Sequence, residues 1–334
     1  MKAPLNALST AVVGNHIYVL LRRGERLLLS ILNANLEIIK TLWSGRGDIG
    51  FILKVEGGRA LISIDNKLYL IKGGEAETVL VAGNKENVFW HLAEAEGRVF
   101  IHEYGQPPCA IYSSKDLEKW EKVITNFDID KRSKHFHYIA FDSYRKWLIS
   151  TLGDGCITRV IISYDLGSSW RPFYKGPWQF VPITVLKDNI VFGMDSGIAK
   201  GGLGIYHPYE DKWDFIFVKW VDKNIKHAQF CDLRFLGRFW IASLGTPQVV
   251  IVSKDLRLWF PLFVEDFKEE FNHNMLLSVG EDIVACSTGK TLLILDKYEI
   301  ERASALKPVM VEYKAYRDKL VGYGFIIKHN IFGS

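Results

Sequence analysis

Histidine, glutamine, carboxylate and tyrosine side chains recur at matching positions of successive short strand-like segments in this chain of 334 residues. The set that stands at the beginning of such segments contains five of the nine histidines: His91, His135, His137, Gln179, His227, Gln229, His273 and Asn274. The set at the end of the following segment is Glu103, Tyr104, Asp154 and Asp195. If the fold brings these positions together, imidazoles that are distant in the sequence become neighbours around one polar site.

Neutral imidazoles combined with glutamine or carboxylate groups are suitable ligands for a divalent metal ion, whose charge stabilises an anionic intermediate. The set is similar to the His and Gln ligands that oligogalacturonate lyases, which are also propellers, use for this purpose. A divalent metal is therefore one candidate cofactor, and the sequence selects neither the cofactor nor the residues that would be its ligands.

The same residues also suit acid–base cleavage of a glycan without a metal. In that interpretation the base is His137 or His135, and the acid is Tyr104 or Glu103. The two aspartates of the second set would instead supply the carboxylate pair of an ordinary glycosidase. A third interpretation is structural, because polar side chains at strand starts often hydrogen-bond neighbouring strands across a channel, and then no ligand is needed.

Short strands dominate the chain, and their spacing repeats. Segments such as 16–21 and 59–64 are rich in β-branched, aromatic and leucine residues and are bounded by Gly, Asn or Asp. Tight turns recur near residues 34, 74, 116, 165, 209, 255 and 296, a period of about 44 residues that holds four short strands. One such sheet cannot cover both of its apolar faces, so the repeats must pack side by side in a ring. The sequence therefore predicts an all-β, seven-bladed β-propeller, with eight blades as the alternative.

The expected complete repeats are approximately 7–43, 47–81, 88–124, 136–176, 179–218, 227–264 and 273–306. The clearest repeat has strands predicted at 88–96, 98–104, 110–114 and 120–124. Residues 1–334 are expected to form a single domain. Residues 309–334 are predicted to add strands that take part in ring closure, since residues 1–6 are too few for a full outer strand. A surface helical turn is expected at 264–272.

Three of the predicted turns share a motif. The segment 163–170, Ser-Tyr-Asp-Leu-Gly-Ser-Ser-Trp, matches S-x-D-x-G-x-x-W at every defined position, 114–120 and 253–259 lack one residue and the glycine, and 206–213 is a degenerate copy. A turn aspartate accepts backbone N–H bonds, glycine tolerates a positive φ, and tryptophan packs over the hairpin. The motif resembles the bacterial neuraminidase repeat, or Asp-box, of the sialidase-like superfamily. This resemblance implies a propeller in which these turns have a structural role.

A looser resemblance covers about residues 88–220. The segments 100–105, 135–137, 152–155 and 193–196 look like parts of uncharacterised exo-sialidase-like bacterial proteins. The resemblance implies a shared fold and a shared site on the face opposite the Asp-box turns. True sialidase activity is not expected, because the Arg-Ile-Pro motif near the N-terminus is absent and no arginine triad falls on matching strands.

Composition limits the remaining function classes. The net charge of +4, from 42 basic and 38 acidic residues, is too small to indicate a nucleic-acid partner. No apolar run reaches the roughly 18 residues of a membrane-spanning helix, and no signal peptide is evident before Asn15, so a soluble cytoplasmic protein is expected. The four cysteines lack CxxC spacing, which predicts either buried thiols or long-range disulfides.

The preferred hypothesis is an Asp-box propeller that binds a carbohydrate-like or other polar ligand at a funnel on its upper face. Glycoside hydrolase and polysaccharide lyase activities are the two catalytic versions, and the basic run 131–134 could attract an acidic polysaccharide. The alternative is a non-catalytic scaffold for protein partners. A cavity reached by His135, His137, Asp154 and Gln179 would favour ligand binding, whereas a plugged mouth with apolar patches elsewhere would favour the scaffold.

Overall fold

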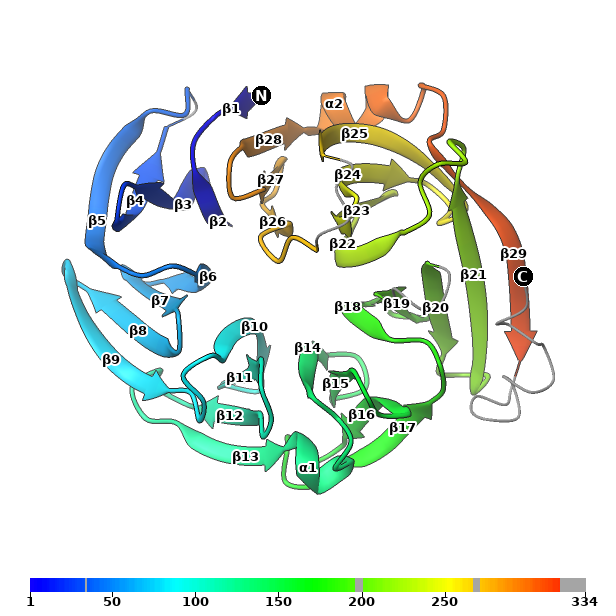
Figure 1. The fold of residues 1–334 in the computed structure, drawn as a ribbon, viewed down its shortest axis with the longest axis horizontal. Helices are drawn as coiled ribbons and strands as arrows, with labels where there is room; N and C mark the ends of the chain where they lie inside the picture. The colour runs from blue at the N-terminus through cyan, green and yellow to red at the C-terminus, as the bar shows by residue number, and fades with distance from the viewer. Residues whose placement is uncertain (34, 196–200, 267–270, 319–334) are drawn as a thin grey trace.

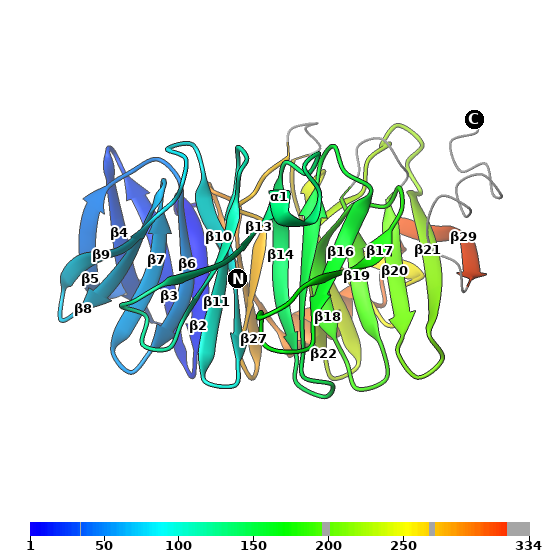
Figure 2. The same cartoon turned by 90° about the horizontal axis from the view of Figure 1, so that it is seen from below.

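The computed structural model describes residues 1–33, 35–195, 201–266 and 271–318, and their strands stand radially around a central axis (Figure 1). Within these ranges there are five four-stranded antiparallel sheets and one nine-stranded sheet. The strands run roughly along the axis of the ring (Figure 2). The all-β propeller architecture predicted from the sequence is confirmed.

Four sheets follow the chain directly, with the first strand nearest the axis and the last at the rim (Figure 1). The first contains β2 (Ala7–Val13), β3 (His16–Arg23), β4 (Arg26–Leu32) and β5 (Ile38–Arg46). The second contains β6 (Gly50–Glu56), β7 (Arg59–Ile64), β8 (Lys67–Lys72) and β9 (Glu75–Val81). The third contains β10 (Val88–Ala95), β11 (Arg98–Tyr104), β12 (Ala110–Ser114) and β13 (Glu121–Thr125), and the fourth contains β14 (His135–Asp142), β15 (Trp147–Gly153), β16 (Thr158–Ser163) and β17 (Arg171–Lys175).

The nine-stranded sheet consists of two four-stranded runs whose outer edges are joined by one further strand. The first run is β18 (Phe180–Val185), β19 (Ile190–Met194), β20 (Gly202–His207) and β21 (Lys212–Trp220). The second run is β22 (Gln229–Leu236), β23 (Phe239–Thr246), β24 (Gln248–Ser253) and β25 (Leu258–Asp266). The joining strand is β29 (Met310–Asp318), which pairs antiparallel with both β21 and β25.

The last sheet combines both halves of the chain. It contains β26 (Leu276–Val279), β27 (Ile283–Ser287) and β28 (Leu292–Asp296), and its fourth strand is the N-terminal β1 (Lys2–Ala3). Lys2 pairs with Leu293 and Ala3 with Leu292, so the first residues of the chain supply an outer strand that the sequence analysis considered too short.

The C-terminal part of the chain differs from the prediction in two places. Residues 297–303 form the helix α2 (Lys297–Ala303) rather than an outer strand, because Asp296 accepts the Glu299 N–H and Glu299 caps Asp296 in return. The described part of the predicted 309–334 closure segment, β29, pairs at the β21 and β25 edges instead of beside β1. Residues 319–334, and residues 267–270 of the predicted helical turn, lie outside the described residues.

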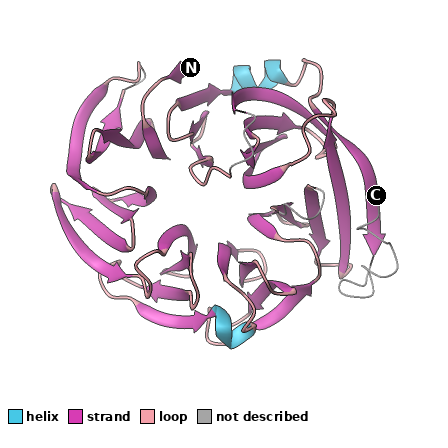
Figure 3. Cartoon of the chain, in the orientation of Figure 1, coloured by secondary structure: helices cyan, strands magenta, loops and turns pink. Residues whose placement is uncertain are grey.

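The inner strands hold the ring together. Along the series β2, β6, β10, β14, β18, β22 and β26, each contacts the next, and β26 contacts β2. Second strands such as β7, β19 and β23 are buried along almost their whole length, because both faces of each sheet are covered. The two described helices, α2 and α1 (Asn126–Ile129), lie at the rim (Figure 3).

The three serine–aspartate turns share one hydrogen-bond network. In the complete copy, the Gly167 N–H donates to Ser163 Oγ at 2.7 Å, and the Ser169 N–H donates to Asp165 Oδ1 at 2.8 Å. The Trp170 indole N–H donates to the Gly167 carbonyl at 3.2 Å. The copies at 114–120 and 253–259 repeat these bonds, with Leu117 at φ 70° and Leu256 at φ 65° in the place of Gly167, whose φ is 89°.

The degenerate fourth copy does not share this network. In the segment 206–213 the Tyr206 hydroxyl donates to Asp211 Oδ1 at 2.8 Å, and Asp211 takes the positive φ of 51°.

The four cysteines are buried free thiols: Cys109, Cys156, Cys231 and Cys286. Neither described helix is long and apolar enough to cross a membrane.

Replacing the turn aspartate should weaken the fold measurably. Asp165→Ala removes the acceptor of the Ser169 N–H and of the Ser169 and Ser163 hydroxyls, and we expect it to lower the free energy of unfolding by about 1 kcal/mol. The measurement is the urea midpoint. The exposed Asp188, in the turn between β18 and β19, is the matched control, and equal losses for Asp188→Ala and Asp165→Ala would contradict a capping role.

Candidate functional site

One end of the central channel collects most of the predicted polar residues. We call the end at which the inner strands begin the upper mouth. Successive strands of a sheet alternate in direction, so the loops after the second strands open on the same face. The three serine–aspartate turns, which join third and fourth strands, therefore lie on the opposite face.

Six inner strands carry a β-bulge near their beginning, and the bulges decide which side chains enter the channel. The pairing with the second strand shifts register in β2, β6, β10, β14, β18 and β22. In β14, Phe136 pairs with Leu152 and Tyr138 with Thr151, so His137 is the unpaired residue. An unpaired bulge residue is re-aimed out of the sheet plane. The His137 ring lies beside the His135 ring, with centroids 4.8 Å apart.

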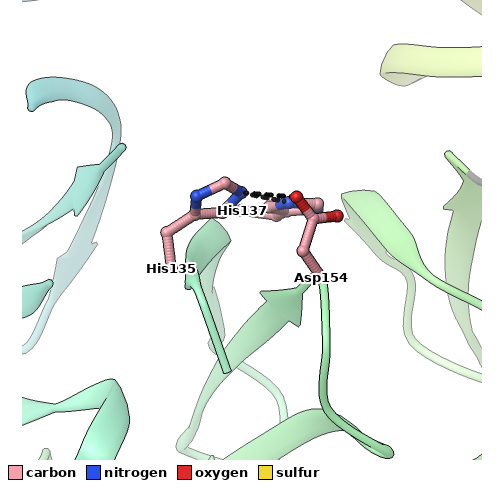
Figure 4. A group of neighbouring side chains, drawn as sticks. All are labelled: His135, His137 and Asp154. Carbon is pink, nitrogen blue, oxygen red and sulfur yellow. Dashed lines mark hydrogen bonds and ion pairs between the residues drawn. The ribbon is translucent and has the colours of Figure 1, made fainter. Parts of the chain in front are cut away.

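His135, His137 and Asp154, which we call the triad, converge at the upper mouth (Figure 4). His135 Nε2 lies 2.9 Å from His137 Nε2 and 3.9 Å from Asp154 Oδ2. One ligand atom from each of the three residues lies within 4.8 Å of the other two. Both histidines are 2% exposed, whereas Asp154 is partly exposed.

The tautomer of His135 leaves one lone pair directed at the centre of the triad, and His137 Nε2, 2.9 Å away, donates its hydrogen to that lone pair. His135 Nδ1 lies 2.7 Å from the Gly105 carbonyl, which can only accept, so Nδ1 carries the hydrogen and Nε2 of the neutral ring has the lone pair. Burial lowers the pKa of both His135 and His137. Both rings are therefore neutral at neutral pH, which is the state of a histidine metal ligand.

A glycine makes room for the triad. Gly153, the last residue of β15, lies beneath the His137 ring, and a Cβ there would stand 1.9 Å from His137 Nε2. Any other residue at this position would displace the imidazole. The packing therefore requires glycine beside the histidine.

Polar contacts extend from the triad to the next two inner strands. The Asp154 N–H donates to Gln179 Oε1 at 3.2 Å, and Gln179 Nε2 donates to the Asp195 carbonyl at 3.3 Å. Gln229 Nε2 donates to Asp195 Oδ1 at 2.9 Å, and Arg159 Nη1 donates to Gln179 Oε1 at 3.4 Å. Burial raises the pKa of Asp195 to about 8, so its carboxyl group is mostly protonated at neutral pH.

Aromatic rings close the channel beside the triad. We give the name ring layer to the rings of four residues: Trp90, Tyr104, His135 and His273. The centroid of the Tyr104 ring lies 4.8 Å from that of Trp90, 5.2 Å from that of His273 and 4.1 Å from that of His135. The centroids of Trp90 and His273 lie 5.2 Å apart. The rings come from three different sheets. They connect opposite sides of the channel and place the Tyr104 ring beside the rings of His135 and His137.

Three predicted site residues lie apart from the triad. Glu103 is 1% exposed and accepts hydrogen bonds from the Gly83 N–H, the Asn87 amide and the Tyr112 hydroxyl at 2.9, 2.9 and 2.7 Å. Neighbouring residues of a strand point to opposite faces, so Glu103 turns away from the channel where Tyr104 enters it. The predicted role of Glu103 as general acid thus has no geometric support.

The other two predicted residues, His91 and His227, lie apart from the triad for different reasons. His91 lies in the bulge of β10, where its ring contacts Trp90, Tyr138 and His102. It therefore lines the channel beneath the ring layer. His227 precedes β22, and its backbone carbonyl accepts a hydrogen bond from the Trp220 indole N–H at 2.6 Å.

Sequence reasoning did not identify two of the contributors. Arg159, near the beginning of the third strand β16, reaches Gln179 from a position outside the two recurring sets of polar residues. Trp90 supplies the centre of the ring layer, and its place one residue before His91 was the sequence signal that could have identified it.

Asn274, a member of the predicted set, donates its N–H to Asn272 Oδ1 within its own loop at 3.0 Å.

No family model and no curated protein matches this chain. Solved structures of low sequence identity share its fold. An oligogalacturonate lyase in complex with manganese has a TM-score of 0.55 at 10% identity, with 90% of this chain and 98% of that chain covered. The extracellular domain of a protein described as a one-component system of B. thetaiotaomicron has a TM-score of 0.54 at 8% identity, with 85% of this chain and 37% of that chain covered. A nidogen/laminin complex gives 0.53 at 11% identity, with 78% and 93% covered.

Buried neutral histidines should make the stability of this protein depend on pH. Burial lowers the pKa of His102 from 6.5 to about 3. Below about pH 6.5 the unfolded chain binds a proton at His102 that the folded chain binds only near pH 3, so folding is progressively disfavoured as the pH falls through that window. His102→Asn, which retains a donor for the Glu103 carbonyl, should reduce the slope of unfolding free energy against pH by about 1.4 kcal/mol per pH unit between about pH 5.5 and 4.

The measurement is urea unfolding of both proteins at several pH values. The difference between them at about pH 7.5 reports lost packing alone, because there the imidazole is neutral in both states. Parallel stability curves for the two proteins from neutral to acidic pH would show that His102 does not titrate as described.

Proposed function

We propose that this chain is a sialidase-like propeller of the Asp-box type whose upper mouth binds a carboxylate-bearing sugar through a divalent metal ion held by His135, His137 and Asp154. The convergence of these three side chains carries the proposal. The manganese-bound oligogalacturonate lyase that shares the fold supports the choice of metal and of sugar class.

The geometry of the triad suits a small divalent ion. Donor atoms bound at about 2.0–2.2 Å in a tetrahedron stand about 3.3–3.6 Å apart, and the triad atoms lie between 2.9 and 4.8 Å apart. The hydrogen bond from His135 Nδ1 to the Gly105 carbonyl is the usual outer contact of a metal-bound histidine. Lys134 Nζ, 3.5 Å from Asp154 Oδ2, is on a partly exposed side chain that can move aside.

The surroundings of the triad favour an anionic ligand. Three protein ligands leave coordination positions open to a sugar carboxylate. Arg159 and Lys134 add positive charge, and the protonated Asp195 adds a donor instead of a negative charge. A bound metal would neutralise the sugar carboxylate and so acidify the adjacent C–H group, which is the requirement of a lyase. Asp195 and Tyr104 are the proton-carrying groups beside that position.

Two finer statements about the fold belong to the same proposal. We infer seven blades, because the nine-stranded sheet divides into two four-stranded runs and seven inner strands form a closed cycle of contacts. The common hydrogen-bond network of the three serine–aspartate turns supports the Asp-box assignment.

Removal of a triad ligand should weaken metal binding. We expect one Mn²⁺ or Zn²⁺ ion per chain by calorimetry at about pH 7.5, where the histidines are neutral, and binding at least roughly tenfold weaker for Asp154→Asn and His137→Ala. The exposed His16 is the control, and His16→Ala should bind as the parent protein does. Absence of a bound ion, or equal affinity in all four proteins, would remove the metal from the proposal.

The affinity for an acidic sugar should fall in alkaline solution. Above about pH 8 Asp195 ionises and its negative charge repels the sugar carboxylate, whereas below that pH it is neutral. Binding of digalacturonate in the presence of Mn²⁺ should therefore weaken from pH 7 to 9, and Asp195→Asn, which stays uncharged, should lose most of this dependence. Calorimetry measures the affinity of both proteins, and the same pH profile for the two would exclude Asp195 from the site.

Product analysis separates the two possible reactions. Appearance of an unsaturated product would identify a lyase, and new reducing ends without unsaturation would identify a hydrolase.

The alternative function is a protein scaffold, and one surface feature favours it. A groove of about 480 Å³ on the face of the serine–aspartate turns is bounded by the hairpins β22–β23 and β26–β27 and by α2. Its apolar lining includes Leu236, Phe239, Ile283 and Ile300. A chain that binds neither metal nor acidic glycans, but loses a protein partner when Phe239 is changed to Glu, would support the scaffold.

A further inference from the structure

Beneath the ring layer the channel contains a cavity, which we call the lower chamber. Its volume is about 540 Å³, and it is lined by residues of β2, β6, β10, β14, β22 and β26. A neighbouring cavity of about 360 Å³ shares Leu92, Glu94, Tyr138, Arg234 and Val279 with it. The described lining of the chamber contains no triad residue, so the chamber is distinct from the site at the upper mouth.

Several buried polar atoms of the lower chamber have no hydrogen-bond partner within the described residues. They are His91 Nδ1, His91 Nε2, Trp90 Nε1 and Arg234 Nε. His91 is only 7% exposed and Trp90 only 2%. Leaving buried donors unpaired costs about 1–3 kcal/mol each, more for a charged group. Three side chains with this feature around one cavity indicate a place built for a polar molecule.

A neighbouring aspartate holds Arg234 in position without using its Nε. The buried Asp232 accepts from the Leu233 and Leu277 N–H groups at 2.8 and 3.0 Å, and from Arg234 Nη2 at 3.1 Å. Its oxygens are thereby committed to the protein. The Nε–H of Arg234 remains available, and the Tyr138 hydroxyl lies beside the same guanidinium group.

The available groups are mostly donors, which selects the charge of the ligand. Arg234 Nε–H and the Trp90 indole N–H can only donate, and His91 offers one donor and one acceptor, because burial, with the charges of His102 and Arg234, keeps its pKa low. The other carboxylate of the chamber, Glu94, is paired with Lys54 at 2.6 Å. The chamber has one guanidinium group, and Asp232 already balances part of its charge. The chamber therefore suits a monoanion better than a phosphate dianion or a cation.

The remaining walls are apolar. Leu53, Leu92, Leu276, Leu277 and Val279 line the chamber together with the faces of Trp90 and Tyr138. Apolar walls bind an apolar body, and the convergent donors fix its polar end. We propose that the lower chamber is a second, separate binding site of this protein for a small organic monocarboxylate, whose carboxylate group is held by Arg234, Trp90 and His91.

The test uses benzoate and 4-iodobenzoate as probes of the full chain. Calorimetry should show one benzoate site, and a crystal soaked in 4-iodobenzoate should show iodine density in the lower chamber. Arg234→Lys preserves a cation for Asp232 but removes the Nε donor, and Trp90→Phe preserves a ring but removes the indole donor. Each should weaken benzoate binding roughly tenfold or more, because each loses a hydrogen bond to a charged group. Arg23→Lys and Trp43→Phe, which lie outside the channel, are the matched controls.

Three outcomes would overturn the proposal. One is iodine density only elsewhere, at the upper mouth or between molecules. Another is unchanged benzoate affinity in a Trp90→Phe or Arg234→Lys protein that retains the parent melting temperature. The third is equal or tighter binding of benzyl alcohol or inorganic phosphate, which would show that the chamber does not select a monocarboxylate. If Arg234→Lys does not fold, Trp90→Phe and the soaked crystal still decide the question. Failure of metal binding at the triad would leave the chamber unaffected.

Discussion

Sheet-to-sheet packing is the constraint on which the rest of this structure depends. The second strands are buried along nearly every residue, so each sheet has two apolar faces and needs a neighbour on both sides. A row of such sheets has two uncovered ends, whereas a ring has none. The last sheet is completed by only two residues of β1 on the edge of β28. The first residues of the chain therefore stabilise a sheet made almost entirely from its last third.

Closing the ring also creates the channel, and the channel creates the site. Inner strands approach one axis from every side, so their side chains compete for little space. The bulges in six of them direct residues such as His91 and His137 inward near the upper end. Gly153 supplies the missing volume beneath the His137 ring. The triad is thus a product of ring geometry, bulge position and one absent side chain.

The sequence predicted the periodic part of this arrangement well and the non-periodic part poorly. The strands predicted at 98–104 and 110–114 are found as β11 and β12. Four members of the recurring polar sets are linked by hydrogen bonds: Asp154, Gln179, Asp195 and Gln229. Bulges are not encoded by a period, so the depth of His91 could not be inferred, whereas strand alternation could have separated Glu103 from Tyr104. The pairing of β29 depends on two edges distant in the sequence. The α2 helix did have a local signal, the Asp296–Glu299 capping box.

The polar lining of the channel is difficult to explain by stability alone. At the upper mouth, Gln179, Asp195 and Gln229 bond to one another and His135 bonds to a carbonyl, whereas His137 Nδ1 and His273 Nδ1 have no partner among the described residues. Below it, His91, Trp90 and Arg234 bring unpaired atoms to one chamber, each at a cost that an apolar side chain of similar size would avoid. The same ring of sheets could be filled with leucine and valine, as its spaces between sheets are. Because three side chains with unpaired buried atoms meet in one cavity on the axis, we infer that the fold has exchanged stability there for the capacity to bind.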